Sequence, residues 1–217
     1  MSDNQAFGVL EELSRAVMRG NAETAESLTK EAIESGLKAE VILKDGLLAS
    51  MAAVGVKFKN NEVFVPEVLV AARAMNRAMA VLKPLLVGEK ALSGGKVVIG
   101  TVKGDLHDIG KNLVKIMFES KGISVVDLGV SVPAERFIEA AISERASIIC
   151  CSALLTSTMY EMKNVVEEAK KAGLRDKVKI MVGGAPINSD FCKEVGADYY
   201  SPDAQSAAEK AAEILGI

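Results

Sequence analysis

The only histidine of this 217-residue chain, His107, lies in the stretch Asp105-Leu106-His107-Asp108-Ile109-Gly110. A carboxylate two positions before an imidazole can accept one ring N–H and so orient the other ring nitrogen toward a metal. One histidine cannot build a site of several protein ligands. It can supply one axial ligand to a metal that brings its own macrocycle.

Composition limits the class of protein. The chain is 49% apolar and 25% charged, as in a soluble globular protein. A net charge of −3 argues against a nucleic-acid partner. No run approaches the length of a membrane span, and Met1-Ser2-Asp3-Asn4 lacks the basic and then apolar start of a signal peptide. We therefore expect a cytoplasmic protein with no nucleic-acid or membrane partner.

The three cysteines, Cys150, Cys151 and Cys192, form no CxxC pair. Adjacent residues on a strand point to opposite faces, so Cys150 and Cys151 cannot easily share a metal. We expect all three to be small buried apolar residues in a reducing compartment.

Apolar periodicity divides the chain into two halves. Residues 1–88 predict a four-helix bundle, and the glycine-rich residues 89–95, within the stretch from Val87 to Gly95, predict a linker. The expected helices are 11–18, a second one between the N-cap Asn21 and Gly36, 39–56, and one opened by Pro66 that runs to about Leu86.

Residues 96–217 alternate between strands and helices, which predicts an α/β domain with a doubly wound, five-stranded parallel sheet. The expected strands are 97–102, 124–128, 147–152, 178–182 and 197–200, and the helices are 111–120, 133–145, 158–172, 189–195 and 204–215. In a flavodoxin-like order 2-1-3-4-5, ligands bind where the first and third strands end. The loops there are 103–110 and 153–157.

Two other kinds of functional site that occur on such sheets do not fit this sequence. A phosphate-binding P-loop needs four residues between its glycines, but Gly104 and Gly110 have five between them, and Asn112 replaces the Ser or Thr that binds magnesium. A phosphoacceptor domain needs an aspartate after the third strand, where this chain has Cys151-Ser152-Ala153.

The residues that follow the third and fourth strands could line a narrow slot for a ligand. Ser152-Ala153-Leu154-Leu155-Thr156 offers hydroxyls and apolar side chains, and Gly183-Gly184 would let a ligand lie against the backbone. With the histidine motif, these separations resemble those of the cobalamin-binding domain family. The stretch from Phe58 through Phe64 to Met75 resembles the helical cap that precedes this domain in methionine synthase and in the corrinoid proteins of methylamine, methanol, betaine and methoxy-aromatic methyltransferase systems.

The resemblance implies a cobalamin cofactor held with its own lower base displaced. His107 would bind cobalt from below, Asp105 would accept from the other ring nitrogen, and Ser152 would extend this pair as a proton relay. The implied cofactor contacts in the α/β half are Gly104, Asp105, His107, Asp108, Ile109, Gly110, Ser152, Leu154, Thr156, Gly183 and Gly184. The last five of these would line the slot for the displaced nucleotide tail.

The resemblance also implies that the cap residues Phe58, Val65, Val68 and Leu69 shield the upper, methyl face from water. The alternative is that these four residues are ordinary bundle core. Residues 57–61 predict a polar loop around Phe58, and the linker would be the hinge that lets the cap swing away.

The implied function is a carrier subunit that turns over no substrate of its own. It would shuttle a methyl group, through Co(I) and methyl-Co(III), between a substrate-specific methyltransferase and an acceptor methyltransferase that uses coenzyme M or tetrahydrofolate, with a reductive activation protein as a third partner. An isomerase small subunit shares the histidine motif but generally lacks the cap. A cobalamin sensor would need an output module, and a purely structural domain would bind no corrinoid.

Overall fold

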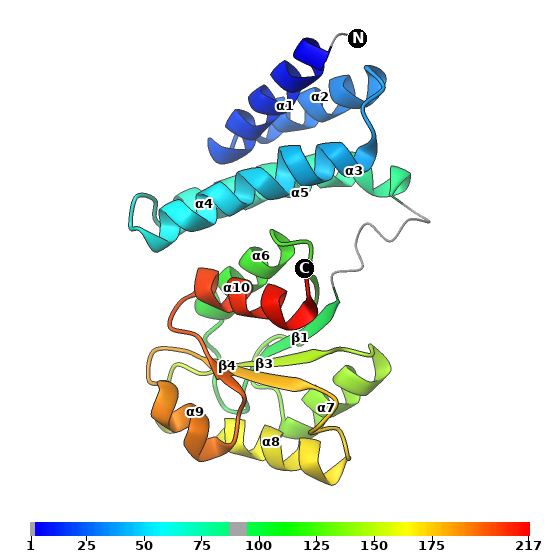
Figure 1. Cartoon of the computed structure of the whole chain (residues 1–217). Helices are drawn as coiled ribbons and strands as arrows, with labels where there is room; N and C mark the ends of the chain where they lie inside the picture. Colours follow the sequence, from blue (N-terminus) through cyan, green and yellow to red (C-terminus); the bar gives the residue numbers. More distant parts are fainter. Residues whose placement is uncertain (1–2, 87–94) are drawn as a thin grey trace. The chain divides into compact units, whose positions relative to one another are not determined.

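The computed structural model describes residues 3–86 and 95–217, with side chains described from Gly8 onward in the first helix (Figure 1). Contacts between Cα atoms divide the chain into two compact units, one helical and one α/β. Of the predicted linker, residues 89–94 lie outside the described residues. Among the helices that are described, none is both long enough and apolar enough to span a membrane.

In the described residues 3–86 of the N-terminal unit, all regular secondary structure is helical. Its elements are α1 (Asp3–Met18), α2 (Ala22–Glu34), α3 (Ala39–Val41), the π-helical segment η1 (Ile42–Leu48), α4 (Ala49–Lys59), α5 (Val65–Leu82) and the 3₁₀ turn η2 (Lys83–Leu85). The Asn21 side chain accepts a hydrogen bond from Thr24 N at 3.2 Å, so it caps α2 as expected. Fully buried side chains from several of these helices form the core, among them Leu13, Leu47, Met51, Val68 and Leu82.

The third expected helix, 39–56, differs in two ways from the structure. It is continued through α3, η1 and α4 to Lys59, and its middle winds as a π-helix. The wider π turn still buries Ile42, Leu43, Gly46 and Leu47, so apolar spacing alone does not reveal it. Phe58 consequently lies in the last turn of α4 and not in a polar loop.

The C-terminal unit is a five-stranded parallel sheet in the order β2-β1-β3-β4-β5, which confirms the expected fold class. The strands are β1 (Lys96–Thr101), β2 (Ser124–Asp127), β3 (Ile148–Ser152), β4 (Lys179–Gly183) and β5 (Tyr199–Tyr200). Helices α6 (Ile109–Glu119) and α10 (Ala204–Leu215) pack together on one face, and α7 (Ala134–Ser143), α8 (Glu161–Lys171) and α9 (Ser189–Val195) lie on the other (Figure 1).

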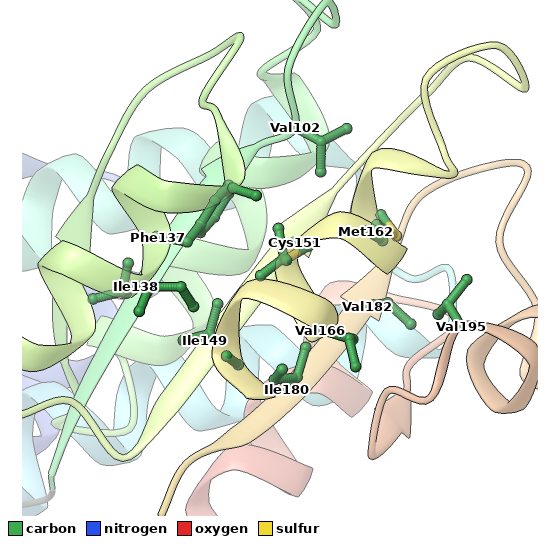
Figure 2. Packing of buried hydrophobic residues seen from close by; sticks show 14 of the residues in the cluster. Val102, Phe137, Ile138, Ile149, Cys151, Met162, Val166, Ile180, Val182 and Val195 are labelled. Atoms are coloured by element: carbon green, nitrogen blue, oxygen red, sulfur yellow. The ribbon is translucent and has the colours of Figure 1, made fainter. Parts of the chain in front are cut away.

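The core between the sheet and helices α7, α8 and α9 is built from aliphatic side chains around Phe137 (Figure 2). Cys151 belongs to this cluster, and burial raises the pKa of its thiol to about 12. All three cysteines are free and buried, as the sequence predicts. Thiols in such surroundings are packing groups and not nucleophiles.

Candidate functional site

The site is built on Asp105, which is fully buried in the loop between β1 and α6. Its Oδ1 accepts hydrogen bonds from His107 Nδ1 at 2.7 Å and from His107 N at 3.0 Å. Its Oδ2 accepts from Leu154 N at 2.8 Å, Leu155 N at 3.2 Å and Thr158 Oγ1 at 2.9 Å. One carboxylate therefore joins the histidine loop to the turn that follows β3.

These hydrogen bonds decide the charge of Asp105. Burial alone would raise the pKa of its carboxyl, but the N–H groups of Leu154 and His107, the His107 ring and the Thr158 hydroxyl outweigh burial and hold the pKa well below its usual range. A carboxylate can only accept, so Nδ1 of His107 must carry the ring proton. The lone pair of Nε2 is then free to bind a metal.

The backbone of the loop fixes the ring from the other side. Thr101 Oγ1, at the end of β1, donates to His107 O at 2.8 Å. Ser131 N donates to Asp105 O at 2.9 Å, and Gly104 N donates to Ser131 Oγ at 3.1 Å. The His107 side chain remains 51% exposed, so its free nitrogen is open to a ligand.

The hydroxyl that donates to Asp105 in this structure belongs to Thr158, and not to Ser152, the residue expected to extend the Asp105–His107 pair. A relay role for Ser152 with the cofactor bound stays a prediction. Ser152 is the last residue of β3, in register with Thr101 and Gly183, and its carbonyl accepts from Val102 N at 3.0 Å. Asp105 Oδ2 faces the turn after the strand, where Thr158 lies. The sequence offers four hydroxyls between positions 152 and 158, and spacing alone does not select one.

The two loops that meet at Asp105 carry exposed apolar side chains. On either side of His107, Leu106 and Ile109 are 71% and 75% exposed, and Leu154 and Leu155, whose N–H groups bind Asp105, are 44% and 40% exposed. Four exposed large apolar side chains on the loops that hold one oriented imidazole suit a broad, partly apolar ligand. At Gly110 a Cβ would meet nothing within 4 Å, so the start of α6 leaves open space there.

The two glycines after β4 have different reasons to be glycine. Gly184 has φ +131°, and a Cβ there would lie 1.8 Å from Ala153 O, so the close approach of the two loops requires glycine at this position. At Gly183 the nearest atom to a Cβ would be Ser201 O, at an ordinary 3.5 Å. At Gly184 the position of a Cβ is thus occupied by Ala153 O, whereas a Cβ at Gly183 would make an ordinary contact. That a ligand lies against either glycine stays a prediction.

The remaining expected contacts are placed as follows. Thr156 is exposed in the turn after β3, and Asp108 is exposed at the start of α6. Of the predicted cap residues, Val68 is fully buried, Phe58 and Val65 are half-buried, and Leu69 is 46% exposed. Phe64, which is 62% exposed at the start of α5, was not among the predicted contacts. Contact of these side chains with a corrinoid stays a prediction.

The residues present fit the corrinoid that the sequence implies. A corrinoid would bring its own macrocycle to its cobalt and would take one further donor atom from the protein. The chain supplies an exposed imidazole with its proton held on the far nitrogen, an apolar rim and open space at Gly110.

Comparison with known proteins agrees with this fit. A family described as B12 binding domain matches residues 95–211, and a second family of the same description matches residues 9–83. A corrinoid protein of Desulfitobacterium hafniense (strain Y51) is 38% identical over 213 residues, which cover 97% of this chain and 99% of that protein. The dimethylamine corrinoid protein of Methanosarcina barkeri is 42% identical over 208 residues, covering 95% and 97% of the two chains.

Among solved structures, a chain of the methanol:cobalamin methyltransferase complex MtaBC from Methanosarcina barkeri superposes with a TM-score of 0.88 and 29% identity, covering 100% of this chain and 81% of that one. The matches cover both halves of the chain and nearly the full length of the relatives. The chain therefore belongs to the B12-binding corrinoid proteins of methyltransferase systems.

Proposed function

We propose that this protein carries a methyl group on a corrinoid whose cobalt is held from below by His107 Nε2. The single observation that supports this role most is the buried Asp105 carboxylate, which holds the ring proton on Nδ1 and leaves Nε2 as the donor. When bound, the corrinoid would supply the cobalt that accepts and releases the methyl group.

The residues of the chain have three tasks in this proposal. Asp105 orients His107 and sets how strongly its ring donates, and the Thr158 hydroxyl shares the charge of that carboxylate. Leu106, Ile109 and Leu154 would cover apolar parts of the macrocycle and keep water from its lower face. The displaced nucleotide tail would lie near Ser152, Thr156 and Gly183.

The partners belong to the same proposal. One methyltransferase would load the methyl group, a second would pass it to coenzyme M or tetrahydrofolate, and an activation protein would restore the reduced cobalt. The likeness to a chain of the MtaBC complex supports the first of these, since that complex is described as a methanol:cobalamin methyltransferase. The relatives named for dimethylamine and trimethylamine support an amine as the methyl source.

A single-turnover transfer tests the carrier role. The chain is reconstituted with hydroxocobalamin, reduced, methylated with methyl iodide and mixed with an acceptor methyltransferase and coenzyme M or tetrahydrofolate. We expect one methyl group per bound corrinoid to reach the acceptor, and the same experiment with His107→Ala to transfer far less. Retention of corrinoid with no transfer to either acceptor would contradict the carrier role while leaving corrinoid binding in place.

A further inference from the structure

A second chain of hydrogen bonds holds the back of the histidine loop. Lys111 Nζ donates to Asp127 Oδ1 at 2.7 Å and to Asn112 Oδ1 at 2.8 Å. Asn112 Nδ2 donates to Asp108 Oδ2 at 3.1 Å, and Asn112 N donates to Asp108 O at 2.7 Å. The chain Asp127–Lys111–Asn112–Asp108 therefore runs from the end of β2 to the residue next to His107.

The position of Lys111 is costly for the fold. Its side chain is 2% exposed, and a buried ammonium is tolerated only when it is paired and hydrogen-bonded. It also lies in the first turn of α6, where the helix dipole disfavours a cation, and that turn has no acidic residue of its own. A residue that destabilises its own helix in this way is often retained because it serves a functional site.

Asp127 is built to receive this lysine. Burial would raise the pKa of its carboxyl, but the hydrogen bonds from Lys111 and from Gly129 N, with the positive charges of Lys111 and Lys115, lower it. Its Oδ1 accepts from Gly129 N at 3.0 Å, which fixes the carboxylate to the turn after β2. Lys115 Nζ, 3.5 Å from Oδ2, is 33% exposed and contacts the same carboxylate from the solvent side.

Two fixed points therefore bracket His107. In front, Asp105 ties the loop to the turn after β3, and behind, Asp108 is tied through Asn112 and Lys111 to β2. An axial ligand must hold its nitrogen at one distance and one angle from the metal, so movement at either end of so short a loop displaces it. We infer that Lys111, through Asn112 and Asp127, is a positioning residue for cobalt ligation by His107.

This inference rests on the proposed His107 ligation, and it deepens that proposal by adding residues that the expected site did not include. Lys111 would touch neither cobalt nor substrate. Its effect should appear in the geometry and strength of the axial bond. Loss of a partner that orients a metal ligand typically weakens metal binding by about 10- to 100-fold.

The test uses cobinamide, a corrinoid without a lower base of its own, so that any axial nitrogen must come from the protein. The full chain and its variants are titrated with cobinamide, and the cobalt is reduced to the paramagnetic Co(II) form. Electron paramagnetic resonance then reports splitting by an axial nitrogen, and the titration reports Kd. We expect Lys111→Met to raise Kd about tenfold and to weaken or broaden the nitrogen splitting.

Two matched variants keep the result interpretable. Lys115→Met removes the other lysine on Asp127 but leaves the chain to Asp108, so Kd and splitting should stay at wild-type values. Lys111→Met combined with Asp127→Asn removes both partners of the buried pair, which is better tolerated than leaving one charge unpaired. If Lys111→Met alone fails to fold, the Kd and the nitrogen splitting of the double variant test the positioning role instead.

The outcomes separate this inference from the proposed function. If the wild type shows no nitrogen splitting, or His107→Ala keeps it, the His107 ligation itself is wrong. The positioning role of Lys111 is wrong if two results occur together. The wild type and the folded variants without Lys111 would all show the splitting, and the Kd of these variants would lie within about twofold of the wild-type value. A lower melting temperature alone would then mark Lys111 as structural.

Discussion

At the residue scale, the geometry of Asp105 carries the account. Five hydrogen bonds end on this buried carboxylate, and only one of them comes from the His107 ring. The sequence predicts the Asp105–His107 pair because the two residues are separated by a single position. It does not predict the Thr158 contact, because that depends on how the turn after β3 folds back onto the loop.

The two hydroxyls give a direct comparison. Thr158→Val removes a donor to an ionised carboxylate and should lower the free energy of unfolding by about 1.5–3 kcal/mol. Ser152→Ala removes a hydroxyl that makes no hydrogen bond to Asp105 and should change it by less than about 0.5 kcal/mol. Urea unfolding of the two purified variants measures both values. A larger loss for Ser152→Ala than for Thr158→Val would contradict the placement of Thr158.

The glycines give a second comparison. Gly184→Ala places a methyl group against Ala153 O at a left-handed φ, so we expect a loss of more than about 3 kcal/mol of stability. Gly110→Ala adds a methyl group in open space on a helix and should raise stability by up to about 1 kcal/mol. If the corrinoid occupies that space, Gly110→Ala should also weaken its binding. Thermal melts and corrinoid titration check the pair, and equal stabilities for the two variants would be inconsistent with the structure.

At the element scale, alternating periodicity and turn signals predict the five strands, their parallel order and some of the caps. Asn21, for example, accepts a hydrogen bond from the first turn of α2 as expected, while the Asn188 cap of α9 is seen only in the structure. The π-helical segment η1 escapes such reasoning because its apolar residues stay buried in either winding. The fifth strand is shorter than expected, since only Tyr199 and Tyr200 pair with β4.

The tie between α6 and β2 predicts a pH dependence of stability. The pKa of Asp127 is lowered in the folded protein, so its contribution is present above the unfolded value of about 3.9 and is lost as pH falls through the lower folded value. Asp127→Asn should cost about 3–5 kcal/mol at pH 7, because it leaves Lys111 buried without its counter-ion. The difference from wild type should shrink below about pH 4.

Denaturant unfolding between pH 7 and pH 3 measures this difference. Asp176→Asn, at an exposed aspartate outside the network, is the matched control and should run parallel to wild type. A cost for Asp127→Asn that is small at pH 7, or that grows toward acid pH, would contradict the buried pair.

At the scale of the whole molecule, two compact units match two families of the same description. The residues predicted to act as a cap differ in burial, so their substitutions should have different effects. Val68 is fully buried, so Val68→Ala should cost about 2 kcal/mol of stability, whereas Leu69 is 46% exposed and Leu69→Ala should cost less than about 0.5 kcal/mol. If Leu69 shields the methyl face, Leu69→Ala should speed light-induced loss of the methyl group. An unchanged photolysis rate would remove Leu69 from the cap.

The most direct measurement uses the fact that His107 is the only histidine in the chain. Protein grown with ¹⁵N-histidine carries that label at one position, and hydroxocobalamin bound to it is reduced to the Co(II) form for electron paramagnetic resonance. We predict that each cobalt line, a triplet in unlabelled protein, becomes a doublet in labelled protein, and that His107→Ala loses this doublet. A triplet that persists in the labelled protein would mean that the corrinoid keeps its own base, and His107 would not be the cobalt ligand.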